Sequence, residues 1–255
     1  MILGVSYNAF DGLELLEASV RSIRDSVDYI NVVYQSVSNF GHALIVDPRP
    51  ILEDLKTKGL IDSYVEYSPR IASGGHYNEV TKRNLGLVNC KLYGCSYFMS
   101  LDVDEMYRAG ELNYVKKIMM DGDYDSSAWK LVTYWKSGEY ILDPPEEYYV
   151  SGIYRIDERR FSMSNKWPVL VDPTRRLEPR KLKIFERSEI QLHHFSYVRQ
   201  DIRSKLENSS ASTNFKDIDV IATYFDKWQP GQRALLAGRE ERYYDLKKVD
   251  NIFNI

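Results

Sequence analysis

The sequence predicts an α/β fold in which a mostly parallel central sheet is covered by helices on both faces. Short apolar segments rich in β-branched and aromatic residues recur along the first half of the 255-residue chain. Between them, hydrophobic residues recur three and four positions apart, as on the buried face of a helix. Strands and helices that alternate in this way form the parallel sheets of α/β proteins.

The first strand is expected at residues 2–7, and a loop follows at 8–12. Asp11 and Glu14 have the spacing of a capping box, so we expect a helix to begin there. The next strand is expected at 29–37, where β-branched and aromatic residues dominate. The helix between these strands has a hydrophobic face made of Leu13, Leu16, Val20, Ile23 and Val27.

Proline and glycine delimit the next helix. Pro48 and Pro50 predict its start, because proline suits the first turn of a helix, and Gly59 predicts its end. The elements expected after it are a strand at 63–68, a helix at 75–93, a strand at 96–101, a helix at 111–121 and a strand at 127–135.

Composition favours one folded domain over residues 1–255. Hydrophobic residues make up 44% of the chain, which is enough to fill a core. We find no internal repeat, low-complexity linker or change of composition. The second half is less regular than the first, and its last part has the pattern of a polar helical tail.

Charge and cysteine content exclude several classes of protein. The net charge of −3 gives no general attraction to nucleic acid or to an anionic membrane. No apolar run reaches the roughly 18 residues of a membrane span, and the first residues lack the basic region of a secretory signal. Cys90 and Cys95 are expected to be reduced packing residues. We therefore expect a cytoplasmic protein, located in the host cytoplasm if the protein is viral.

Three carboxylates follow the strand at 96–101, in the sequence YFMSLDVDEMY. Ligands of α/β sheets bind beyond the carboxyl ends of the strands. Asp102 and Asp104 supply the hard oxygen atoms that a divalent cation prefers. They point to opposite sides of an extended chain, so they converge on one ion only if the chain turns. With such a turn, one of them could instead bind the metal and the other a ribose hydroxyl.

The segments GVSYNAFDGLELLEASVRSI and YFMSLDVDE resemble GT-A-type glycosyltransferases, especially family 2-like enzymes of viral and bacterial type. The likeness covers about residues 1–135, and HHFSYVR and PVLVDPTRR extend it. It implies a nucleotide-diphosphosugar transferase fold, with 1–135 as the nucleotide-sugar half and 136–255 as the acceptor half. It also implies a hexosyltransferase-like reaction, in which a sugar moves from a nucleotide-diphosphosugar, most simply UDP-linked, to a hydroxyl of a glycan or glycoprotein acceptor.

The same resemblance assigns the residues that would bind the donor. Gln35 stands where the family often has an acidic residue that reads the base, so the identity of the base stays open. Asn78 and Lys82 share one helical face and would contact ribose or phosphate, unless this face is simply solvated. The residues that would line the nucleoside pocket are Ser6, Tyr7 and Asn8, with Tyr7 against the base.

A cation, Mn²⁺ or Mg²⁺, is implied as the cofactor. Asp104 would bind it directly, Asp102 would bind it or the ribose, and Glu105 would be structural. His194 would be a further ligand or a diphosphate contact, because imidazole and carboxylate together suit Mn²⁺; its alternative is a structural histidine, as for His193. The residues that would close over the diphosphate are Arg199, Arg203 and Lys205, which otherwise form an exposed basic helix.

A catalytic base is needed if the transfer inverts configuration. Asp172 is the first candidate, because Pro173 stiffens its turn and the following arginines would keep it ionised. An Asp-Pro turn with a salt bridge is the structural alternative. The rival bases are Glu146 and Glu147.

Two other functions stay open. A non-catalytic nucleotide- or glycan-binding protein could share the fold, although the intact D-V-D sequence argues against it. A metal-dependent nuclease would use the same carboxylates and the basic segment 175–187, although the net charge gives it little support. Under the glycosyltransferase hypothesis, Asp104→Ala should abolish metal-dependent turnover without a cost to stability.

Overall fold

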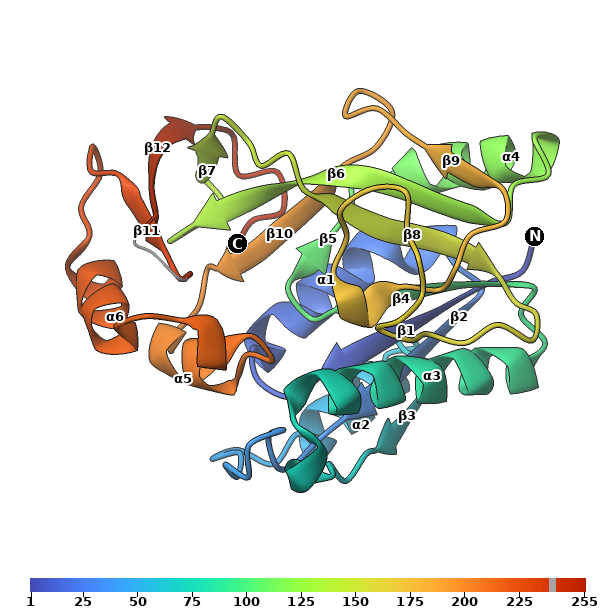
Figure 1. Ribbon diagram of the computed structural model, residues 1–255, viewed down its shortest axis with the longest axis horizontal. Helices are drawn as coiled ribbons and strands as arrows, with labels where there is room; N and C mark the ends of the chain where they lie inside the picture. Colours follow the sequence, from blue (N-terminus) through green and yellow to red (C-terminus); the bar gives the residue numbers. More distant parts are fainter. Residues whose placement is uncertain (239–241) are drawn as a thin grey trace.

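The computed structural model describes residues 1–238 and 242–255. Its strands form a large mixed sheet with the order β11-β12-β7-β6-β8-β4-β1-β2-β3, and Figure 1 shows the helices arranged around it. The strands are β1 (Leu3–Ala9), β2 (Tyr29–Tyr34), β3 (Ser63–Glu66), β4 (Tyr97–Asp102), β5 (Glu105–Met106), β6 (Ser126–Trp135), β7 (Tyr140–Asp143), β8 (Tyr149–Arg155), β9 (Leu182–Ile184), β10 (Leu192–Tyr197), β11 (Ala234–Leu236) and β12 (Arg242–Lys248). The helices are α1 (Leu16–Ile23), α2 (Arg49–Thr57), α3 (Gly75–Tyr93), α4 (Glu111–Asp121), α5 (Ile202–Asn208) and α6 (Ile218–Lys227).

The predicted α/β fold is confirmed, and each strand and helix expected in the first half is present with slightly shifted ends. Strands β3, β2, β1 and β4 are parallel neighbours. Beyond them, β8 inserts between β4 and β6 and is antiparallel to both. The sheet is therefore mixed at this side, because β8, which comes later in the chain than both β4 and β6, lies between them.

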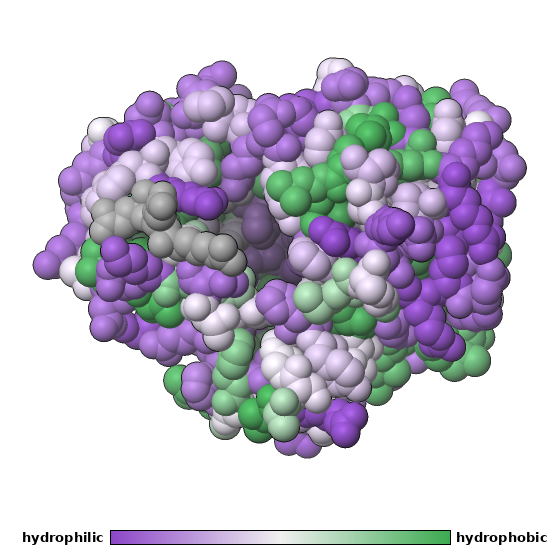
Figure 2. All heavy atoms as spheres, viewed as in Figure 1, coloured by the Kyte–Doolittle hydropathy of each residue, from purple (hydrophilic) through white to green (hydrophobic). Residues whose placement is uncertain are grey.

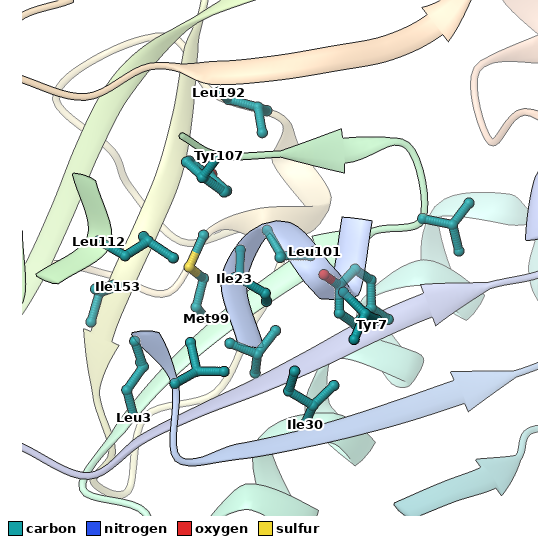
Figure 3. Packing of buried hydrophobic residues seen from close by; sticks show 14 of the residues in the cluster. Leu3, Tyr7, Ile23, Ile30, Met99, Leu101, Tyr107, Leu112, Ile153 and Leu192 are labelled. Atoms are coloured by element: carbon teal, nitrogen blue, oxygen red, sulfur yellow. The ribbon is translucent and has the colours of Figure 1, made fainter. Parts of the chain in front are cut away.

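Alternate residues of β1 face opposite layers of the molecule. Leu3, Val5 and Tyr7 belong to the largest hydrophobic cluster, together with residues of α1, α2 and α4. Figure 3 shows Tyr7 within this packing. The residues between them face α3, which packs so closely that a Cβ added to Gly86 would lie 2.1 Å from Ser6 Oγ. This alternation decides which side chains of β1 can reach a ligand.

The start of the first helix differs from the capping-box prediction. Gly12, with φ 70°, is the N-cap of a 3₁₀ turn at Leu13–Leu15 that leads into α1, and no side chain caps it. A Cβ at Gly12 would lie 1.2 Å from Arg199 Nη1. Glycine therefore admits the arginine here, and Asp11 lines a cavity instead of capping a helix.

The tail is also not entirely helical. Helices α5 and α6 are followed by β11 and β12, which are antiparallel, and β12 pairs with β7. Cys90 and Cys95 are buried free thiols, as predicted. In the described part of the chain, no helix is long and apolar enough to cross a membrane.

Candidate active site

A cavity of about 400 Å³ lies at the carboxyl ends of β1, β2 and β4. Figure 2 shows the molecule hollowed near the middle of one face, with hydrophilic residues inside the hollow. Most of the residues predicted to form a site line the cavity. They are Asn8, Gln35, Lys82, Asp102, Asp104, Asp172, His194, Arg199 and Lys205.

Two residues predicted for the nucleoside pocket do not line this cavity. Ser6 is fully buried between β1 and α3, with its Oγ 3.4 Å from Asn31 Oδ1. Tyr7 points to the opposite layer, where its hydroxyl accepts a hydrogen bond from Ser19 at 3.0 Å. Asn8 follows the alternation of β1 back to the α3 face and does line the cavity.

Asn78 is also outside the cavity. Its Oδ1 accepts hydrogen bonds from Tyr67 Oη at 2.7 Å and from the amide of Arg70 at 2.9 Å. Its Nδ2 donates to the carbonyls of Arg70 and Gly74. Asn78 therefore fixes the loop before α3, and its amide has no group left for a ribose or phosphate.

Asp102 is held by two arginines at the end of β4. Arg175 Nη2 lies 2.6 Å from its Oδ2, and Arg83 Nη2 lies 3.2 Å from its Oδ1. Burial opposes ionisation, but these arginines lower the pKa of Asp102 below its usual value. Arg175 also pairs with Glu105, whose Oε2 accepts from the amide of Asp102 at 3.0 Å. The predicted structural role of Glu105 thus has a physical basis in this turn.

Asp104 points into the cavity toward the second half of the chain. It forms an ion pair with Arg199, and both side chains are almost fully buried. Its Oδ1 lies 3.8 Å from His194 Nε2. Burial opposes ionisation of this carboxyl too, and Arg199 and His194 lower its pKa.

The donors at Asp104 and His194 fit a divalent cation. Burial lowers the pKa of His194 to about 4, so its imidazole is neutral near pH 7 and its lone pair is available. Within residues 1–238 and 242–255, no group of three or more carboxylate, imidazole and thiolate residues is placed to hold a metal. The predicted set of three ligands is thus not assembled: Arg83 and Arg175 pair with both oxygens of Asp102, whereas Arg199 pairs with Oδ2 of Asp104 and leaves its Oδ1 facing His194. The remaining two donors suit a cation that takes its other ligands from water or a bound anion.

Two further cations line the cavity. Lys205 Nζ donates to Ser196 Oγ at 2.6 Å, and burial lowers the pKa of this lysine. Lys82 Nζ lies 2.9 Å from Glu79 Oε1. Arg203 lies outside, where it pairs with Asp219. Of the three residues predicted to close over a diphosphate, the structure brings Arg199 and Lys205 into the cavity.

The three candidate bases differ in their position relative to the cavity. Asp172 lines the cavity; its Oδ1 accepts from the amide and hydroxyl of Thr174 at 2.8 and 2.9 Å, which leaves Oδ2 4.0 Å from Arg175 Nε. Glu146 bonds to Thr133, and the 78% exposed Glu147 pairs with Lys130. Neither glutamate lines the cavity, so the geometry favours Asp172.

Glu79 and Asn39 both line the cavity and were not predicted from the sequence. Glu79 stands three and four residues before Lys82 and Arg83, a spacing that places all three on one face of α3. That spacing was the available signal. Asn39 lies in the loop after β2, and only the folded chain brings it to Glu79.

In the basic segment 175–187, several arginines are paired with groups of the protein itself. Arg175 is buried against carboxylates, and Arg180 pairs with Glu158 and Asp157. Arg187 donates to backbone carbonyls. The nuclease hypothesis therefore loses the feature that favoured it.

No protein-family model matches the sequence, and no curated protein matches it. Among solved structures, TarS of S. aureus, residues 1–349, aligns with a TM-score of 0.50 and 10% identity, over 82% of this chain and 66% of that one. The same segment in complex with UDP aligns with a TM-score of 0.49 and 11% identity, over the same shares of both chains. The longer TarS structure gives 0.48 and 12%, over 82% of this chain and 40% of that one.

This chain therefore spans less than two thirds of the TarS structures it resembles. At such low identity the likeness concerns the fold alone. Together with the parallel strands β3-β2-β1-β4 and the antiparallel β8, it shows that the chain has the GT-A fold.

Proposed function

We propose that this chain is a glycosyltransferase, similar to family 2 enzymes, that moves a sugar from a UDP-sugar to a hydroxyl of a glycan or glycoprotein. The observation that carries the proposal is the placement of Asp104 and His194, 3.8 Å apart, in a cavity at the ends of parallel strands. Four cationic side chains line the same cavity. They are Lys82, Arg83, Arg199 and Lys205.

These charges suit a nucleoside diphosphate. Asp104 and His194 would hold Mn²⁺ or Mg²⁺, which when bound would neutralise charge that develops on the diphosphate leaving group. Arg199 and Lys205 reach the same region from the segment after β10 and would contact phosphate oxygens directly. Asn8 and Gln35, at the ends of β1 and β2, would lie at the nucleoside end. UDP is the nucleotide that the TarS segment binds in its solved complex, and we carry it to this chain as part of the proposal.

Asp172 is the residue we propose as the base. Thr174 fixes its Oδ1, so Oδ2 is the oxygen that would take the proton from the acceptor hydroxyl. Tyr148 also lines the cavity and would offer a flat apolar surface to a sugar ring.

A non-catalytic nucleotide-binding protein is the second candidate, because arginines already neutralise Asp102 and Glu105. Release of UDP from a panel of UDP-sugars, measured with and without Mn²⁺, separates the two. Manganese-dependent release that Asp104→Asn abolishes is the result we expect. Binding of UDP without hydrolysis or transfer for any sugar would favour the non-catalytic protein.

A further inference from the structure

The nucleoside end of the cavity contains a chain of side-chain amides that ends on one carboxylate. Gln35 Nε2 donates to Asn39 Oδ1 at 3.1 Å and to the carbonyl of Val37 at 3.0 Å. Asn39 Nδ2 donates in turn to Glu79 Oε1 at 2.9 Å. From the other side, Asn8 Nδ2 donates to Glu79 Oε2 at 3.1 Å. We call these four side chains (Asn8, Gln35, Asn39 and Glu79) the amide relay.

Glu79 fixes the direction of the whole amide relay. An ionised carboxylate has only acceptors, so an amide that bonds to it must turn its NH₂ group inward. Although burial opposes the charge, Lys82 keeps the pKa of Glu79 below its usual value. Asn8 and Asn39 are therefore held in one orientation. Because Asn39 then turns its oxygen toward Gln35, the Gln35 amide is held as well.

This orientation leaves two acceptors for a ligand. Asn8 Oδ1 and Gln35 Oε1 are buried and have no hydrogen-bond partner among the described residues. Both residues line the cavity, and they are 6% and 1% exposed. A buried acceptor without a partner costs free energy, so a ligand that donates hydrogen bonds here is favoured.

We propose that Glu79 is a positioning residue that makes the cavity select nucleobases with a ring N–H, such as uracil. The inference rests on the proposed function, since it assumes that a nucleoside binds here. The N3–H of uracil can donate to one of the free carbonyl oxygens. Cytosine has a lone pair at the same ring position, which would face that oxygen without a hydrogen bond. The amide relay thus gives the neutral Gln35 the acceptor role of a carboxylate.

Calorimetric titration with nucleoside diphosphates tests the proposal. We expect wild type to bind UDP at least about tenfold more tightly than CDP, and to bind N3-methyl-UDP, which lacks the N–H, as weakly as CDP. In Glu79→Gln, the side chain offers both an NH₂ group and an oxygen, so the amides of the relay are no longer held in one orientation. The ratio of the affinity for UDP to the affinity for CDP should therefore fall toward one. UDP and CDP carry the same diphosphate. Any effect of the lost Glu79 charge on diphosphate binding is therefore the same for both ligands and does not change the ratio.

Three further variants distinguish a positioning role of Glu79 from a general loss of structure. Glu53→Gln, an equivalent change at an exposed residue of α2, should keep the wild-type ratio. Gln35→Glu added to Glu79→Gln should restore the preference for UDP, because a carboxylate at position 35 accepts in either orientation and Asn39 can turn to donate to it. If Glu79→Gln does not fold, Asn39→Leu breaks the amide relay at its middle and should lower the ratio in the same way.

The outcomes that overturn the inference are distinct. Equal affinity of wild type for UDP, CDP and N3-methyl-UDP would remove the selectivity but leave a nucleotide site. An unchanged ratio in folded Glu79→Gln would remove the positioning role. Failure of every nucleoside diphosphate to bind would overturn the proposed function and this inference with it.

Discussion

Asp104 and His194 stand 90 residues apart in the chain and meet in the cavity, with Oδ1 and Nε2 separated by 3.8 Å. The strand pairing explains the contact, because β5 follows Asp104 directly and pairs antiparallel with β10, where His194 is opposite Glu105. The carboxylate and the imidazole are thus held by backbone hydrogen bonds, so the geometry of the donor pair does not depend on flexible loops.

Asp104→Asn will lower stability as well as metal binding. The sequence alone suggested no cost, but the carboxylate is buried against Arg199, and its loss leaves an unpaired buried cation. We expect the free energy of unfolding to fall by about 3–5 kcal/mol. Glu17→Gln, which breaks the exposed pair with Arg21, should cost less than about 1 kcal/mol. Urea unfolding measures both, and equal losses would contradict the account.

Arg175→Met will destabilise the turn after β4. Arg175 is the shared partner of Asp102 and Glu105, and the side chains of Arg175 and Glu105 are 5% and 4% exposed. Without it, two carboxylates lose their common cation, and we expect a loss of about 3–5 kcal/mol in unfolding free energy. Arg175→Lys should keep only part of the stability that Arg175→Met loses, because lysine cannot donate to two carboxylates with the planar, bidentate geometry of a guanidinium group. If Arg175→Lys were as stable as wild type, the bidentate geometry of the Arg175 guanidinium would not matter for stability.

Asp172→Asn will slow transfer without weakening nucleotide binding. Asparagine can keep the bonds from Thr174 through its oxygen, but it cannot take a proton. We expect kcat to fall by about 10²–10⁴-fold with an unchanged Kd for UDP. Glu147→Gln is the control, since Glu147 lies outside the cavity and should leave kcat unchanged. The opposite pattern in the two variants would identify Glu147 as the base.

His193 makes stability depend on pH. It is buried on the other face of β10, where Tyr134 Oη lies 2.9 Å from its Nδ1, and burial lowers its pKa to about 3. Arg108 is the charged group that lowers it further. The unfolded histidine titrates near 6.5, so below that pH the unfolded chain binds a proton that the folded protein does not.

The unfolding free energy is therefore unaffected by His193 titration above pH 6.5 and decreases as the pH falls from 6.5 toward about 3. Relative to His193→Gln, wild type should lose about 2–3 kcal/mol of unfolding free energy between about pH 7.5 and 4.5. Urea unfolding of both proteins at the two pH values measures this difference. A difference that does not change with pH would show that His193 is not buried in its neutral form.

The first half of the fold could be predicted because its signals are local. The hydrophobic spacing of α1 and the prolines at the start of α2 act within a few residues, and the elements formed where they were expected. The insertion of β8 between β4 and β6 could not be predicted, because it depends on pairing between distant segments. The hairpin of β11 and β12 was missed for the same reason.

In the candidate site, too, local signals could be predicted and long-range contacts could not. The sequence shows Asp102 and Asp104 as clustered charge at the end of a strand, and both residues line the cavity. Ser6 and Tyr7 were misplaced because the period of two in β1 sends them to packed layers. Asn78 was wrongly assigned to the donor site because the hydrogen bonds of its side-chain amide hold the loop before α3. The path of that loop cannot be read from the neighbouring residues in the sequence.

Calorimetric titration of UDP in the presence and absence of Mn²⁺ tests the central claim most directly. Two protein donors leave most of the coordination to water and diphosphate, so we expect Mn²⁺ to tighten UDP binding by at least about tenfold. Folded Asp104→Asn should lose this gain, and Glu17→Gln should keep it. UDP affinity that is the same with and without Mn²⁺ in the wild-type protein would contradict the account.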